Sequence, residues 1–200
     1  MLSLVEHVEA FASRAFQQYS ERDLQGALRS LGRALQIDPG CEFALMMRGH
    51  IWLETNHPRL AIRDLDVVIV HNPESISAYL RRAEARRSMG QPHAALRDCE
   101  QILLRDETNP TALHLRAGLK TDLRRFPEAL EDLDRLVEFH PDHLKGRIDR
   151  GFVRFILGDL QGARTEFGTV MVSSDPAEEN TVALARVLFT VVERTIHSLR

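Results

Sequence analysis

Small residues recur in this chain at a constant interval of 34 positions. A column that holds Gly or Ala is followed, twelve positions later, by a column that holds only Ala. The two columns are Ala15, Gly49, Ala83, Ala117 and Gly151, and then Ala27, Ala61, Ala95, Ala129 and Ala163. Self-similarity at a fixed period of this length is typical of an array of equivalent structural units. We therefore expect a row of repeats rather than a fold around one central core.

Two apolar columns and a set of turn residues predict that each unit is a pair of helices. The apolar columns lie three positions apart, on one face of a helix: Leu31, Leu65, Cys99, Leu133 and Phe167, then Ala34, Val68, Ile102, Leu136 and Val170. Pro39, Pro73 and Pro141 interrupt the helical pattern between units. Two helices approach closely only where side chains are small, so we expect Ala61, Ala95 and Ala129 to be almost fully buried.

This period and these columns resemble the tetratricopeptide repeat (TPR) family, whose 34-residue unit is a helix, a turn and a second helix. The resemblance implies an all-α fold: a right-handed superhelical solenoid of antiparallel helix pairs with a C-terminal helix. It divides the chain into an N-terminal extension, five repeats and a capping helix, at residues 1–7, 8–41, 42–75, 76–109, 110–143, 144–175 and 176–200. The chain departs from the family at its Tyr column, which reads Gln18, Trp52, Arg86, Lys120 and Arg154.

Arginine also follows the period, at Arg14, Arg48, Arg82, Arg116 and Arg150. On the second helix of repeats two to five, a further column is acidic: Asp64, Asp98, Asp132 and Glu166. We expect each arginine to pair with the acid of its own repeat in a bidentate brace. The alternative is an arginine ladder that binds a polyanion. With 26 Lys and Arg against 29 Asp and Glu, the chain lacks the basic excess of nucleic-acid-binding domains, which argues against a nucleic-acid partner.

The sequence contains no motif for catalysis. His140 and His143 have the spacing of metal ligands, but they straddle the turn between two repeats and have no third ligand. A glycine-rich phosphate loop, a nucleophile elbow and an HExxH motif are all missing. We therefore expect no enzyme activity, no cofactor and no metal. Two cysteines are too few for a disulfide scaffold, and no apolar run is long enough to span a membrane, so we expect a soluble cytoplasmic protein.

In the TPR family, the first helix of each unit lines a concave groove with roughly its second, fifth, ninth and twelfth positions. The resemblance implies a non-catalytic scaffold or adaptor that binds a peptide or protein segment in this groove. The residues expected there are Phe16, Tyr19, Met46, His50, Leu53, Leu80, Glu84, Arg87, His114, Ile148, Phe152 and Phe155. The alternative for the aromatic residues is that some of them only cover the open ends of the stack.

The expected groove is apolar at its ends and polar in its middle. Its ends should hold hydrophobic side chains of a ligand. Arg87, flanked by His50 and His114, should accept an acidic side chain or a terminal carboxylate. Because histidine gains charge towards about pH 6, binding should strengthen modestly on mild acidification.

One TPR subclass binds the acidic C-terminal tail of cytosolic chaperones through Lys, Asn and Arg residues. The corresponding positions here are Ala12, Phe16, Met47, Ser77 and Arg81. Only Arg81 matches, so the sequence disfavours this mode of binding.

The C-terminal helix supports a rival function. Asp175 is suited to its N-cap and Pro176 to its first turn. An apolar set suits burial on repeat five: Val182, Leu184, Ala185, Leu188, Phe189, Val192, Ile196 and Leu199. Val187 and Val191 remain on the outer face, where a simple cap would be polar. This suggests a homodimer through Val187 and Val191, and hence a structural, self-assembling protein whose main contact is the C-terminal helix.

Overall fold

The computed structural model describes residues 3–172 and 178–199. Within this part of the chain the fold is all-α, without strands, as the sequence predicts. The helices are α1 (Leu4–Ser20), α2 (Leu24–Ile37), α3 (Glu42–Glu54), α4 (Pro58–His71), α5 (Ile76–Ser88), α6 (Pro92–Leu103), α7 (Pro110–Asp122), α8 (Phe126–Phe139), α9 (Leu144–Ile156), α10 (Leu160–Met171) and α11 (Glu179–Ser198). None of the described helices is long and apolar enough to cross a membrane.

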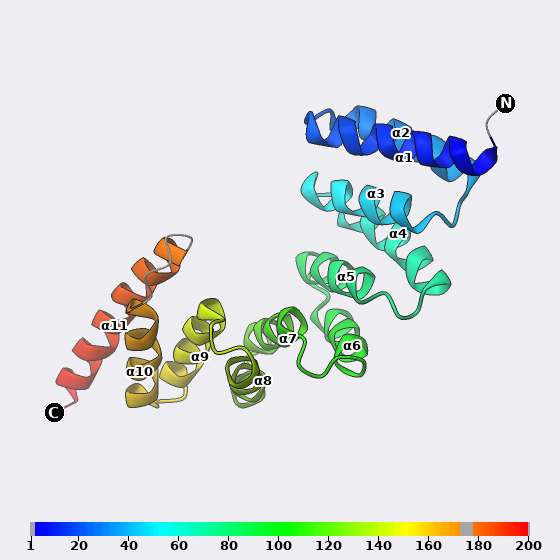
Figure 1. The fold of residues 1–200 in the computed structure, drawn as a ribbon. Coiled ribbons are helices and arrows are strands. Elements are labelled where there is room, and N and C mark those ends of the chain that lie inside the picture. Colours follow the sequence, from blue (N-terminus) through cyan, green and yellow to red (C-terminus); the bar gives the residue numbers. More distant parts are fainter. Residues whose placement is uncertain (1–2, 173–177, 200) are drawn as a thin grey trace. The chain divides into compact units, whose positions relative to one another are not determined.

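The chain divides into two compact units, residues 1–101 and 102–200. In the first unit α1 packs on α2, α2 on α3, α3 on α4 and α4 on α5 (Figure 1). In the second unit α7 packs on α8, α8 on α9, α9 on α10 and α10 on α11. Each unit is thus a stack of helix pairs, in which the second helix of one pair also contacts the first helix of the next.

The turn inside each pair follows one pattern that repeats through the array. At its centre is a residue in the left-handed region: Arg22, Asn56, Gly90, Arg124 and Gly158, with φ between 58° and 85°. The next residue donates its N–H to a carbonyl five positions earlier, as in Asp23 to Gln18 at 2.8 Å and Arg125 to Lys120 at 2.8 Å. This is the Schellman arrangement, which ends a helix and turns the chain sharply back. The short turns therefore make the two helices of a pair antiparallel.

Side-chain caps fix where several helices begin. Ser3 forms a capping box with Glu6 at the start of α1, so residues 4–7 are its first turn rather than an extension before it. Asp23, Asn109 and Asp159 accept the backbone N–H three residues ahead at the start of α2, α7 and α10.

The small-residue columns lie where the helices of a pair cross. Ala61, Ala95 and Ala129 are completely buried, which confirms the prediction. The apolar columns of the second helix fill the space between the helices, with the side chains of Leu65, Cys99 and others of that column buried.

The four predicted arginine pairs are all present; they are bidentate for Arg48, Arg82 and Arg116, whereas Arg150 donates one hydrogen bond to Glu166. Their closest N–O distances are 2.6 Å for Arg48–Asp64, 2.7 Å for Arg82–Asp98, 2.5 Å for Arg116–Asp132 and 2.5 Å for Arg150–Glu166. The alternative interpretation of this column, a ladder that binds a polyanion, is wrong because the guanidinium groups of Arg48, Arg82, Arg116 and Arg150 are already engaged by buried carboxylates. In repeat one the acid is replaced by Ser30, which donates to Gln18 at 2.6 Å.

On α11 the predicted burial is right for most of the apolar set. Val182, Ala185 and Val192 are buried, and Leu188, Phe189 and Ile196 pack against them. The prediction is wrong for Leu184 and Leu199, which are exposed. Leu184 lies about 100° around the helix from Ala185, on the outer side, and Leu199 follows the last helical residue. The proposed N-cap Asp175, Pro176 and the repeat boundary at 175/176 lie outside the described residues.

Candidate functional site

In the first unit, three successive first helices contribute to one chain of hydrogen bonds. Arg81 of α5 donates to Nδ1 of His50 on α3 at 2.7 Å, and Nε2 of His50 lies 2.9 Å from the hydroxyl of Tyr19 on α1. Burial of the hydroxyl, followed by its hydrogen bond to Glu54, raises the pKa of Tyr19. The first helices of the three pairs therefore present one connected polar surface.

The direction of these bonds assigns the tautomer of His50. A guanidinium group can only donate, so Nδ1 accepts from Arg81, and Nε2 carries the proton that it donates to Tyr19. A second proton on His50 would remove the hydrogen bond from Arg81. Both ring nitrogens of His50 are thus engaged by side chains of the protein itself.

An apolar cavity of about 440 Å³ lies on the first helices of the same unit. Phe16 of α1 is 60% exposed beside it, and the exposed Phe43 of α3 lies on its other side. Val8, Glu9, Ala12, Ser13 and Cys41 complete its lining. Two exposed phenylalanine rings beside an apolar cavity can hold a hydrophobic side chain of a partner.

The second unit has its own cavity, of about 330 Å³, between α7, α9 and α11. Its lining combines His114, Lys145, Ile148 and Asp149 with Asn180, Thr181 and Leu184 of the terminal helix. Nε2 of His114 lies 2.6 Å from Oδ2 of Asp149, within hydrogen-bond distance. This cavity offers Lys145 and the polar side chains of α11 beside an apolar floor.

His140 and His143, the pair with the spacing of metal ligands, both form hydrogen bonds with backbone groups. His140 contacts the carbonyl of Thr108 at 2.7 Å, and Nδ1 of His143 accepts the Gly146 N–H at 2.9 Å as the N-cap of α9. Burial first, and then the charge of His114, lower the pKa of His143. The ring of His114 lies edge-on to that of His143, with centroids 5.0 Å apart.

The residues predicted for the groove fall into three groups by burial. Phe16 and Phe152 are exposed aromatic rings, at 60% and 43%, and Glu84 and Arg87 are also exposed. A second group is half-buried, and several of its members pack against the hydrophobic cores: Tyr19, Met46, His50, Leu53, Leu80, His114 and Phe155. Ile148 forms the third group: it is buried, and it lines the cavity of the second unit.

Some residues that line these cavities were not assigned from the sequence. Glu9, Phe43 and Lys145 occupy the second position of their repeats, which is a groove position in the TPR family, so the repeat register alone contained the signal. Asn180 and Thr181 had no such signal, because α11 lies outside the repeat pattern.

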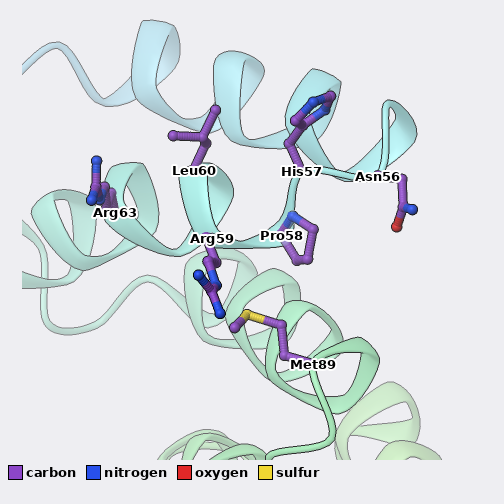
Figure 2. Close-up of a pocket in the computed structure, with 7 residues that line it drawn as sticks. All are labelled: Asn56, His57, Pro58, Arg59, Leu60, Arg63 and Met89. Carbon is purple, nitrogen blue, oxygen red and sulfur yellow. The ribbon is translucent and has the colours of Figure 1, made fainter.

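A third cavity, of about 570 Å³, lies on the second-helix side of the first unit, where α4 begins and α5 ends (Figure 2). Its apolar lining includes Pro58, Leu60 and Met89, and Arg59 and Arg63 are beside them. This cavity was not predicted from the sequence.

Comparison with known proteins agrees with this architecture, although no protein-family model matches the chain. Hsc70-interacting protein 1 of Drosophila melanogaster is 28% identical over 86 residues, which are 43% of this chain and 23% of the relative. The chain thus spans about a quarter of the length of this curated relative.

Two solved structures superimpose over most of the chain. A tetratricopeptide repeat protein from Parabacteroides merdae gives a TM-score of 0.80 at 17% identity, over 97% of this chain and 79% of that one. YrrB, described as a TPR protein with an unusual peptide-binding site, gives 0.71 at 14% identity, over 92% and 98% of the two chains. Together with the helix pairs and their repeated columns, these likenesses identify the fold: the chain folds as tetratricopeptide repeat arrays do.

Proposed function

We propose that the protein is a non-catalytic, cytoplasmic scaffold or adaptor that binds a peptide or protein segment on the first-helix faces of its units. The observation that carries the proposal is the apolar cavity beside Phe16 and Phe43, on the face where Arg81, His50 and Tyr19 form a polar strip. A side chain that enters this cavity would leave its backbone next to that strip. Apolar anchors flanked by hydrogen-bonding groups are the usual composition of a binding site for a peptide.

The second unit supports the same function with different chemistry. Phe152 is exposed on α9, and the nearby cavity combines Lys145 with Asn180 and Thr181. Lys145 would attract a carboxylate, and Phe152 would contact an apolar side chain. We therefore propose that each unit binds its own short segment of a partner.

The names of similar proteins are consistent with binding of a protein or peptide, but they do not identify the partner of this chain. The relative from Drosophila is named for its interaction with Hsc70, and YrrB for a peptide-binding site. In this chain Phe16 occupies a position where chaperone-tail binding needs a polar or basic residue, and Arg81 is bound to His50. We therefore propose a partner other than an acidic chaperone tail.

Affinity capture from cell extract, with quantitative mass spectrometry, tests the proposal. The double variant Phe16→Ala/Phe152→Ala should lose the partners captured by the wild-type protein. Phe139→Ala is the matched control, because Phe139 is equally exposed but lies at the end of a second helix, α8. If all three proteins melt alike and capture the same partners, the first-helix faces are not the binding surface.

The C-terminal helix supports a second candidate function, self-assembly. Leu184, Val187 and Val191 form an exposed apolar stripe along α11, with Val187 61% exposed. Burying such a stripe against its copy in a second molecule would form a symmetric dimer.

A further inference from the structure

A second arginine column lies on the outer face of the first unit. Arg29, Arg63 and Arg97 follow the 34-residue period on α2, α4 and α6. Each comes two positions after a buried alanine, which is about 200° around the helix, so it points away from the core. All three are exposed, and none has an ion pair with any residue that the structure describes. Arg48, Arg82, Arg116 and Arg150, by contrast, are paired with buried carboxylates.

The equivalent positions in the second unit are not basic. They hold Glu131 on α8 and Thr165 on α10. The repeat architecture therefore does not itself require arginine at this position. The basic column is a property of the first unit, which makes a role in packing a poor explanation for it.

The third cavity lies beside the middle arginine of this column. Arg59 and Arg63 are part of its lining, and none of its seven lining residues is acidic. Figure 2 shows the side chain of Arg59 extending towards Met89 from the start of α4. The N-cap of α4, His57, makes no side-chain capping bond, so the positive end of the helix dipole also faces this region. The site thus combines an apolar pocket with concentrated positive charge.

We propose that the second-helix face of the first unit, defined by Arg29, Arg63, Arg97 and the cavity at Arg59 and Met89, binds an acidic peptide segment. Carboxylates of the segment would pair with the arginines, whose planar guanidinium groups bind carboxylates bidentately. One apolar side chain of the segment would enter the cavity next to Met89 and Leu60.

The spacing suits an extended chain. Helices α2 and α4 both pack on α3, and packed helices lie about 8–10 Å apart, so the axes of the helices that carry Arg29 and Arg63 lie within about 20 Å of each other. An extended peptide covers that distance in about six residues. Acidic residues at intervals of about six positions would therefore reach Arg29 and Arg63 in turn.

A peptide fits this face better than a single-stranded nucleic acid. Such nucleic acids need aromatic side chains on which their bases stack, in addition to positive charge. None of the residues that define this face, the three arginines and the residues that line the cavity, is Phe, Tyr or Trp. The cavity instead has an apolar part, formed by Pro58, Leu60 and Met89, which an aliphatic side chain can contact. This surface is separate from the first-helix faces of the proposed function.

Fluorescence anisotropy with a labelled glutamate-rich peptide of about 12 residues, long enough to span about 40 Å, tests the proposal. The peptide carries one central leucine, and a second peptide has glycine in its place. The wild-type protein should bind the leucine peptide more tightly than the glycine peptide. The triple variant Arg29→Gln/Arg63→Gln/Arg97→Gln should bind the leucine peptide about tenfold more weakly.

The matched control is Arg14→Gln/Arg186→Gln/Arg194→Gln, which removes the same charge from exposed positions elsewhere. Unchanged binding by this control supports the proposal, and an equal loss in both triple variants overturns it, because net charge alone would then account for binding. Tighter binding of oligo(dT) than of the peptide, lost in the first triple variant, also overturns it in favour of a nucleic acid. Equal binding of the leucine and glycine peptides overturns the role of the cavity. Failure of these tests leaves the first-helix proposal untouched, since Phe16 and Phe152 are not altered.

Discussion

Arg82 binds two carboxylates at once, and one of them, Asp66, belongs to the preceding repeat. The Arg82–Asp66 distance is 2.6 Å, and the same guanidinium group lies 2.7 Å from Asp98 of its own repeat. Arg150 repeats this arrangement with Asp134 and Glu166. Arg82 and Arg150 therefore join neighbouring repeats as well as the two helices of their own repeat. Burial acts to lower the pKa of Arg82, but hydrogen bonds to Asp98 and Asp66 raise it overall.

Replacing Arg82 should lower the free energy of unfolding much more than replacing Asp66. Arg82→Gln leaves Asp98 buried with only Arg86 as an ion-pair partner and should lower the free energy of unfolding by about 3 kcal/mol. Asp66→Asn should cost about 0–1 kcal/mol, because the Asp66 side chain is 50% exposed. Urea denaturation followed by circular dichroism measures both. Equal losses would mean that the bond between repeats is as important as the brace within one.

Two glycines of the same column should respond oppositely to alanine. A methyl group at Gly49 would lie 3.6 Å from Leu65, an ordinary contact, so Gly49→Ala should stabilise α3 by up to about 1 kcal/mol. A methyl group at Gly151 would lie 2.6 Å from the buried ring of Phe167, so Gly151→Ala should destabilise by about 1–3 kcal/mol. Thermal melts of the two variants measure both changes in stability. A stabilised Gly151→Ala would show that Phe167 moves aside easily.

Two substitutions in the left-handed turn column should also have opposite effects on stability. Gly90→Ala should cost about 1 kcal/mol because its φ is 67°, although an added methyl group has no neighbour within 4 Å. Arg124→Gly, at φ 58°, should stabilise by a few tenths to about 1 kcal/mol. Denaturant midpoints measure both changes. A loss of stability in Arg124→Gly would indicate that the Arg124 side chain itself stabilises the turn.

The sequence predicted the parts of the fold that every repeat must satisfy. The alanine columns and the arginine braces were predicted correctly because each is fixed by contacts within one repeat. The left-handed column was missed, since Arg22 and Arg124 are not residues that indicate such a turn. The polar strip through His50 was also missed, because Arg81 and Tyr19 come from different repeats and their contacts follow no common column. Contacts that occur once leave no periodic signal.

Stability should fall in mild acid through His143. Its pKa is lowered in the folded protein, so the unfolded chain takes up a proton first as the pH falls below the ordinary value of 6.5. The folded form is then disfavoured, and the protonated Nδ1 can no longer accept from Gly146. The contribution is fully present above pH 6.5 and is lost as the pH falls from 6.5 to the lowered pKa.

The variant His143→Asn isolates this effect, because asparagine caps a helix but does not titrate in this range. Its free energy of unfolding should depend less on pH between about 7 and 5 than that of the wild-type protein. The groups whose charges act on His143, namely His114, His140 and Asp149, are retained in the variant. Parallel pH profiles for the two proteins would exclude His143 as the source of acid sensitivity.

The exposed stripe on α11 predicts a change of mass with concentration. If two copies pair through Val187 and Val191, the wild-type protein should approach twice its 22.8 kDa chain mass at high concentration. Val187→Glu would place a charge in the centre of the contact and should restore the single-chain mass, because an unpaired buried charge is strongly unfavourable. Arg186→Glu, on a different side of the helix, should still dimerise, which separates the stripe from general effects of charge. Light scattering across a concentration series measures all three proteins. A wild-type mass of 22.8 kDa at every concentration would remove self-assembly as a function of this helix and leave Leu184, beside the cavity of the second unit, as its apolar residue most relevant to binding another protein.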